Sequence, residues 1–242
     1  EYSYWFDYML TGLQTVDTPI PLGGTSNHFK LDKLIELGAW DPFNVTEDAD
    51  LGVRVFEKLY RIGVVSSTTL EEANNEPFNW IRQRSRWIKG YMQTFLVHMR
   101  NPAHLVQRIG WKGFFGFNFF IGGTSVTFLV YPVLLLFFFV YLIFDLTAVK
   151  ALFPAWVLYV GIFNFIAGNV LMIYINMLAV FKRRYYELIL FAMLNPVYWL
   201  MHSIAAYKGL WQLIYKPFYW EKTNHGLTKM SHSSAAAAAS TT

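Results

Sequence analysis

Cysteine is absent from the 242 residues, which excludes disulfide bonds and thiolate metal sites. Charge is also scarce: 15% of the residues are charged and the net charge is +4, whereas 55% are apolar and 19% are aromatic. These apolar and aromatic fractions are high for a soluble protein. The basic residues adjoin apolar runs, which indicates a membrane surface, and no nucleic-acid motif is present. The composition therefore predicts a membrane protein that does not bind nucleic acid.

A leader sequence and an initiator methionine are lacking as well. The chain opens with Glu1-Tyr-Ser-Tyr-Trp, which has neither a basic start nor a small-residue cleavage site for a signal peptidase. We expect from this abrupt start that the chain is part of a longer protein.

Two long runs contain no charged residue, at 117–144 and 155–181. Each exceeds the roughly 20 residues that cross a hydrocarbon core, so each predicts a transmembrane helix. Residues 101–116, which precede the first run, carry scattered basic residues on an apolar stretch and predict an interfacial helix. Basic residues before the first run and at Lys182 to Arg184 place both of these edges on the cytoplasmic side.

A third apolar stretch occupies residues 186–214. Asn195-Pro196 interrupts its centre, and a third crossing would carry Lys208 and Lys216 outside, against the positive-inside rule. We therefore predict a broken interfacial helix on the cytoplasmic face. The loop that follows, residues 217–229, then returns to the side that holds the first 100 residues. Residues 230–242 are of low complexity and predict a disordered tail.

The first 100 residues mix helical and strand patterns. Apolar positions recur at helical spacing over residues 1–14, and Leu31, Leu34 and Ile35 predict the inward face of a short helix that ends at Gly38. The β-branched run from Val64 to Leu70 predicts a strand.

Small and acidic residues mark two further segments. Gly23-Gly24-Thr25 permits close approach of a ligand to the backbone, although a tight turn explains it equally well. Three acids, Glu47, Asp48 and Asp50, crowd the start of a predicted helix. Thr46 or Asp48 can cap this helix, while mutual repulsion among the acids favours a second role, such as proton abstraction, for at least one of them.

A later helix carries Gln83, Arg86 and Trp87 on one face, since they are spaced at i, i+3 and i+4. Arg86 can bind a phosphate in a bidentate manner, and the indole of Trp87 offers a flat surface for a sugar or a base. The alternative is that Trp87 anchors the core and the arginines meet lipid headgroups. The aromatic residues of the loop 217–229 likewise suit simple anchoring at the interface.

The order of these motifs resembles that of the processive family 2 glycosyltransferases, which include the cellulose, hyaluronan, chitin and poly-N-acetylglucosamine synthases. The likeness runs from the Gly23 turn through Thr46-Glu47-Asp48 and Gln83-x-x-Arg86-Trp87 to paired membrane helices, and covers most of residues 1–229. It implies an α/β fold for residues 1–100, as the second half of a GT-A type nucleotide-sugar domain. An α-helical membrane region with two transmembrane helices and interfacial helices would follow it.

The resemblance also implies roles for single residues. Asp48 is similar to the family's general base, Glu47 lies beside it in the substrate site, and Gln83 and Arg86 would lie near the nucleotide diphosphate and the acceptor. Trp87 would form the sugar platform. The remaining implied residues are the acceptor-side turn, Gly23, Gly24 and Thr25, and a gating loop over the nucleotide, with Phe218, Trp220, Lys222 and Thr223 as its candidates.

The activity implied is that of a membrane-bound inverting glycosyltransferase, which polymerises a polysaccharide from a nucleotide-sugar donor, such as a UDP-sugar, and helps to translocate it. The implied location is the bacterial inner membrane, with a cytoplasmic site. A growing glycan, membrane lipid and accessory export subunits would be its partners. Two other hypotheses remain open: a non-processive enzyme that glycosylates a lipid carrier, and a non-catalytic membrane scaffold or export subunit.

One part of the family pattern is missing. The family's divalent metal, Mg²⁺ or Mn²⁺, and its nucleotide-binding acid are held by residues upstream of this match. No Asp-x-Asp precedes Gly23, and Asp48-Ala49-Asp50 lies within the base motif, so no residue is assigned to metal. We therefore expect the 242-residue chain by itself to be inactive.

Overall fold

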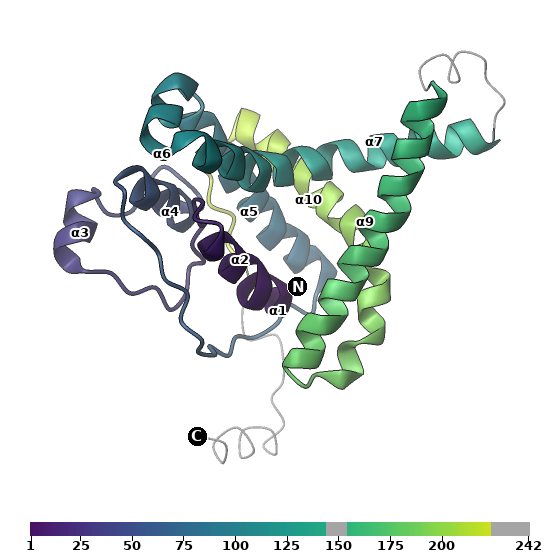
Figure 1. The fold of residues 1–242 in the computed structure, drawn as a ribbon, viewed down its shortest axis with the longest axis horizontal. Coiled ribbons are helices and arrows are strands. Elements are labelled where there is room, and N and C mark those ends of the chain that lie inside the picture. Colours follow the sequence, from purple (N-terminus) through teal and green to yellow (C-terminus); the bar gives the residue numbers. More distant parts are fainter. Residues whose placement is uncertain (144–153, 224–242) are drawn as a thin grey trace.

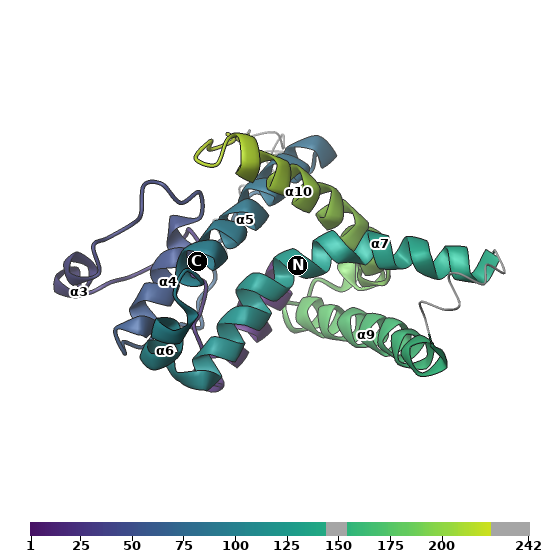
Figure 2. The same cartoon turned by 90° about the horizontal axis from the view of Figure 1, so that it is seen from above.

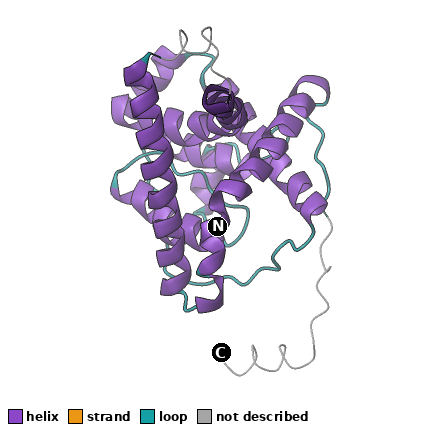
Figure 3. Ribbon diagram, turned by 90° about the vertical axis from the view of Figure 1, so that its right-hand side faces the viewer, coloured by secondary structure: helices purple, strands orange, loops and turns teal. Residues whose placement is uncertain are grey.

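The computed structural model describes residues 1–143 and 154–223, and within these ranges it consists of helices joined by loops (Figure 1). Figure 3 shows no strand in this part of the chain. The prediction of an α/β fold, as half of a GT-A type domain, is therefore wrong for the described residues. The predicted tail at 230–242, the last part of the predicted loop 217–229 and most of the connector between the first two apolar runs lie outside them.

The residues from Val64 to Leu70, which were predicted to form a strand, have no regular secondary structure. Val65 and Leu70 are 78% and 76% exposed, and the Val64 amide donates to a side chain, Gln14 Oε1, at 2.9 Å. A strand requires a neighbouring strand to accept its backbone hydrogen bonds. The β-branched composition is present, but the described residues supply no partner strand.

The chain begins with a continuous helix, as predicted for residues 1–14. Its parts are α1 (Tyr2–Tyr4), a π-helical turn η1 (Trp5–Met9) and α2 (Leu10–Thr15). Leu10 and Leu13 are buried against Ile20. The next helix, α3 (Leu31–Glu36), also forms where it was predicted, but its expected inward face points outward, with Leu31 and Ile35 about 70% exposed.

Helix α5 (Pro77–His98) lies at the centre of the molecule. It begins with proline in the first turn, where the missing N–H costs nothing. Helix α4 (Glu47–Glu57) packs across it, and α10 (Asn195–Tyr215) runs along its other side (Figure 2). A Cβ on Gly209 of α10 would lie 2.8 Å from the Ser85 carbonyl of α5, so glycine permits this close contact.

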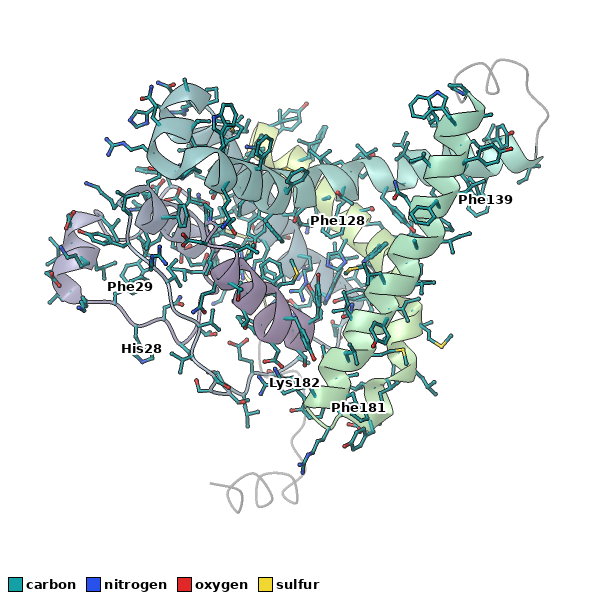
Figure 4. All side chains as sticks on the ribbon, in the orientation of Figure 1. His28, Phe29, Phe128, Phe139, Phe181 and Lys182 are labelled. Carbon is teal, nitrogen blue, oxygen red and sulfur yellow. The ribbon has the colours of Figure 1, made fainter. Side chains whose placement is uncertain are left out.

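The membrane-type helices leave this centre. The segment from α6 (Pro102–Phe117) through a π-helical turn η2 (Asn118–Gly122) to α7 (Gly123–Ile143) bends at Gly110, whose φ is 68°. Helix α9 is Ala155–Lys182. In Figure 4, Phe139 of α7 lies far from the centre, whereas Lys182, the last residue of α9, lies close to the first helix of the chain.

Three helical segments, rather than the predicted two, are long and apolar enough to cross a membrane: Pro102–Tyr141, Ala155–Lys182 and Tyr186–Tyr215. The third consists of the 3₁₀ turns η3 (Tyr186–Leu188) and η4 (Leu190–Leu194) followed by α10. The prediction of two spans overestimated the break at Asn195-Pro196, because the proline lies in the first turn of α10, where helices tolerate it. These apolar helices indicate association with a membrane.

Candidate active site

Asp48 lies in the first turn of α4. Its Oδ1 accepts a hydrogen bond from the Ala49 amide at 2.8 Å, so it satisfies one of the N–H groups that a helix start leaves free. Thr46 occupies the N-cap position but makes no capping side-chain bond. Its own amide instead donates to Asn44 Oδ1 at 3.0 Å. One oxygen of Asp48 therefore holds the helix start.

The environment of Asp48 raises the pKa of its carboxyl. Burial raises the pKa of its carboxyl to about 6, and the negative charge of Glu47 adds to this effect. The Ala49 hydrogen bond and the positive charge of Arg86 lower the pKa, but they do not outweigh the burial. A carboxylate with this pKa is ionised at pH 7 and still has appreciable affinity for a proton.

The small-residue turn lies against this carboxylate. A Cβ on Gly24 would lie 3.3 Å from Asp48 Oδ2, and one on Gly23 would lie 3.3 Å from the ring of Phe6. The Asn27 amide side chain donates to the Gly23 carbonyl and closes the turn. Thr25 is exposed. The structure thus brings the turn and the acid together, although 21 residues or more separate them in the sequence.

A cavity of about 410 Å³ opens between them. Gly24, Glu47 and Asp48 line it, as do four residues that were not among the predicted site residues: Ser26, Asn27, His28 and Trp40. The first three of these follow the glycine turn directly, so their proximity could have been anticipated. No feature of the sequence indicated that Trp40 lies near the turn. Its position depends on the chain reversal after α3, where Gly38 and Ala39 both have positive φ.

Polar contacts fix the start of α4 against α5. Asn44 Nδ2 donates to Thr94 Oγ1 at 2.8 Å, and the Val45 amide donates to Gln93 Oε1 at 3.1 Å. Asn44, Gln93 and Thr94 are all buried. A Cβ on Gly90 would overlap the side chain of Thr46, so only glycine permits this approach. These contacts determine where Asp48 lies relative to α5.

The three predicted residues of α5 have different surroundings. Trp87 packs against Tyr2, and the guanidinium of Arg84 lies over the indole of Trp87, 4.1 Å from the ring centre. Gln83 Oε1 accepts from the same guanidinium at 3.1 Å. Arg84, which is 3% exposed, was not predicted, and it joins two of the motif residues. Arg86 turns instead towards the segment that follows α10.

That segment, residues 217–223, lies along α5 and is held through its backbone. Three side chains of α5 donate to every second backbone carbonyl of this segment: Gln93 to Pro217 at 3.0 Å, Lys89 to Tyr219 at 2.5 Å, and Arg86 to Glu221 at 3.0 Å. Because the bonds go to backbone oxygens, the sequence of the segment gave no indication of them. Lys89 is fully buried.

The predicted loop residues are placed as follows. Trp220 lies 4.2 Å from the Arg86 guanidinium, and Phe218 packs edge-on against Phe43. Thr223 is buried and Lys222 is exposed. The unpredicted Glu221 anchors the segment, with its carboxylate bound to Lys208 at 2.8 Å and Gln212 at 2.9 Å, both on α10. Arg86, a predicted diphosphate ligand, is thus covered by Trp220 and by a carbonyl.

The described residues do not fit the expected divalent metal. No group of three histidine, aspartate or glutamate side chains within residues 1–143 and 154–223 lies close enough to hold an ion. In Asp48-Ala49-Asp50, the two carboxylates have separate environments. Both oxygens of Asp50 are engaged, one by Arg54 at 2.7 Å and one by His98 at 2.9 Å. No metal-dependent step is therefore assigned to these residues.

A family model described as glycosyl transferase family group 2 matches residues 8–207, which include the Gly23 turn, Asp48 and the α5 motif. The segment 217–223 lies beyond the matched residues. No curated protein and no solved structure matches the chain.

Proposed function

Because the chain belongs to glycosyl transferase family group 2, we propose that it supplies the acceptor side of a membrane-bound inverting glycosyltransferase, which extends a polysaccharide from a nucleotide-sugar donor. The observation that carries the proposal is the position of Asp48. Its carboxylate has a pKa near 6, faces a glycine turn and lines a cavity wide enough for a sugar. A general base that removes a proton from a sugar hydroxyl requires these properties.

In the proposed reaction, Asp48 accepts the proton of the acceptor hydroxyl as its oxygen attacks the anomeric carbon of the donor sugar. The bond between that carbon and the diphosphate oxygen breaks on the opposite side, so the configuration inverts. The nucleoside diphosphate leaves with an additional negative charge. Arg86 offers a positive charge to stabilise the leaving diphosphate. This residue lies close enough to Asp48 for its charge to lower the pKa of that carboxyl.

One feature favours a growing glycan as the acceptor over a lipid carrier. Trp87 is held by Arg84 in a fixed position, which suits stacking of a sugar ring. The segment 217–223, which is bound by side chains of α5 and α10, covers Arg86. We place this site on the cytoplasmic side of a bacterial inner membrane, with the donor-binding acid and the Mg²⁺ or Mn²⁺ ligands elsewhere in the whole protein.

The test compares Asp48→Asn with Asp32→Asn in membranes that contain the whole protein. Asp32 is an exposed acid of α3 outside the cavity. Loss of the base should lower sugar transfer by about 10²–10⁴-fold, while Asp32→Asn retains full transfer and both variants retain nucleotide binding. A radiolabelled screen across several nucleotide sugars identifies the donor. Unchanged transfer by Asp48→Asn would refute the assignment and would favour a scaffold or export subunit.

The pH dependence gives a second test. Only the ionised form of Asp48 accepts the proton, so transfer should rise with pH through about 6 and should retain about one tenth of its maximum one pH unit below that midpoint. Product size then separates the two acceptors. A ladder of long chains supports polymerisation, whereas a single glycosylated lipid indicates a carrier-specific enzyme.

A further inference from the structure

A buried ionic cluster joins α4 to the C-terminal end of α5. His98, the last residue of α5, lies between two carboxylates of α4: its Nε2 is 2.9 Å from Asp50 Oδ1 and its Nδ1 is 2.7 Å from Glu57 Oε1. Asp50 also accepts a hydrogen bond from Arg54 Nε at 2.7 Å, and Arg54 donates to the Leu37 carbonyl at 2.6 Å. The cluster therefore connects α4, α5 and the end of α3.

The charges within the cluster balance. The side chains of His98 and Asp50 are 8% and 5% exposed, and that of Glu57 is 25% exposed. Two carboxylates face one guanidinium and one imidazole, so the group is neutral when the imidazole is protonated. Phe117, at the end of α6, packs its ring against His98, with ring centres 5.7 Å apart.

His98 is an imidazolium at neutral pH. Burial alone would lower its pKa, but the hydrogen bonds and charges of Asp50 and Glu57 outweigh that effect and raise the pKa to about 9. Both ring nitrogens then donate, one to each carboxylate. The position at the C-terminal end of α5 also favours a positive charge.

We propose that His98 is a positioning residue for Asp48, holding α4 in the register that keeps the Asp48 carboxylate buried beside the cavity. The inference rests on the proposed function, since it assumes that Asp48 is the base. Asp48 and Asp50 share the first turn of α4, so the helix cannot shift at Asp50 without moving Asp48. Neutral contacts at Asn44 and Val45 hold the start of α4, and His98 supplies the charged anchor.

The chemistry explains why such an anchor matters. A displacement of about 1 Å at a catalytic group can cost about 10²-fold in rate. The same displacement admits water to Asp48, and the pKa of its carboxyl, which burial raises, then falls towards its ordinary value. A weakened anchor should therefore slow the reaction and also move the acidic limb of its pH profile to lower pH.

The test uses His98→Gln in the whole protein, with His104→Gln as the matched control. Glutamine retains hydrogen-bonding capacity but has no charge, and His104 lies on α6, where its ring contacts Arg108. We expect His98→Gln to lower kcat about tenfold, to leave KM for the donor within about twofold, and to shift the acidic limb down by about one pH unit. His104→Gln should leave all three unchanged.

A merely structural role for His98 would lower the amount of active enzyme without moving the limb. The difference in free energy of unfolding between wild type and His98→Gln should be largest below pH 6.5. It should disappear as the pH rises through about 9, because folding raises the pKa of the His98 imidazole. If His98→Gln does not fold, Glu57→Gln removes only the more exposed partner and should shift the limb in the same direction.

Two results are distinguished. If Asp48→Asn is inactive and the acidic limb stays in place in both His98→Gln and Glu57→Gln, the positioning role is overturned and the proposed function stands. If Asp48→Asn remains active, the proposed function itself fails. A shift of the limb in either variant, together with a normal limb in His104→Gln, supports the positioning role.

Discussion

Two regions of the molecule are held together by different forces. Around α4 and α5, buried polar side chains make hydrogen bonds to partners far away in the sequence, such as Asn44 to Thr94 and Arg86 to the Glu221 carbonyl. Helices α7 and α9 diverge from that centre (Figure 1) and expose apolar side chains along their length. A stacked pair, Phe138 and Phe165, is one of the ring contacts between them.

The first region is stabilised by specific packing, whereas the second presents an apolar surface. In the α4–α5 region a side chain has one set of partners, so its shape and hydrogen-bonding groups both matter. On α7 and α9 an exposed leucine or phenylalanine suits a hydrocarbon environment, in which lipid chains replace protein partners. The same substitution should therefore have very different effects in the two regions.

A pair of leucines gives the largest expected difference. Leu51 on α4 is fully buried, whereas Leu136 on α7 is 63% exposed. Leu51→Ala should lower the free energy of unfolding by about 2–5 kcal/mol, because it leaves a cavity, and Leu136→Ala should change it by about 0.5 kcal/mol or less. Thermal unfolding of both variants in detergent measures the difference. Equal losses would mean that α7 is packed as tightly as α4.

A pair of glycines gives a smaller difference. Gly90→Ala puts a methyl group into the side chain of Thr46, whereas a Cβ on Gly161 of α9 meets no atom within 4 Å. The first change should cost about 1–3 kcal/mol by overpacking and should also reduce sugar transfer, since Thr46 is two residues from Asp48. Gly161→Ala should be neutral or slightly stabilising, because alanine is the better helix former. A neutral Gly90→Ala would show that α4 can move away from α5 without loss.

The helices could largely be predicted from the sequence, but the fold class could not. Periodicity identified the helix at residues 1–14 and the uncharged runs, because these signals are local. The segment from Val64 to Leu70 has the composition of a strand, yet strand formation depends on a partner that composition does not reveal. The outward face of α3 shows the same limit, since Leu31 and Ile35 have helical spacing without a neighbour to cover them.

The site could be predicted in part for a similar reason. Gly24 and Asp48 belong to short motifs, and the structure brings them together: a Cβ on Gly24 would lie 3.3 Å from Asp48 Oδ2. The residues that hold those motifs in place were missed. Arg84, Lys89 and His98 act through burial and through partners more than 40 residues away or on backbone carbonyls, and no local pattern reports such contacts.

The last prediction concerns the link between the two regions. Arg183, directly after α9, forms a bidentate contact with Asp7 of the π-helical turn and donates to Thr68. The guanidinium holds the pKa of the Asp7 carboxyl below its usual range, so the contact contributes at neutral pH and is lost as the pH falls below about 4. Because Arg183 is partly exposed, Arg183→Gln should cost only about 1 kcal/mol.

The neighbouring Arg184→Gln is the matched control, since it removes the same charge from the same end of α9. At pH 7 it should unfold at the wild-type temperature, whereas Arg183→Gln should unfold a few degrees lower. Asp7→Asn should lower the transition by a similar amount, and the double variant Arg183→Gln/Asp7→Asn should be no less stable than either single variant, because both remove one contact. Additive losses would show that the two residues stabilise the protein separately rather than through this ion pair, and that α9 is joined to the site region by its packing against α1 and α10.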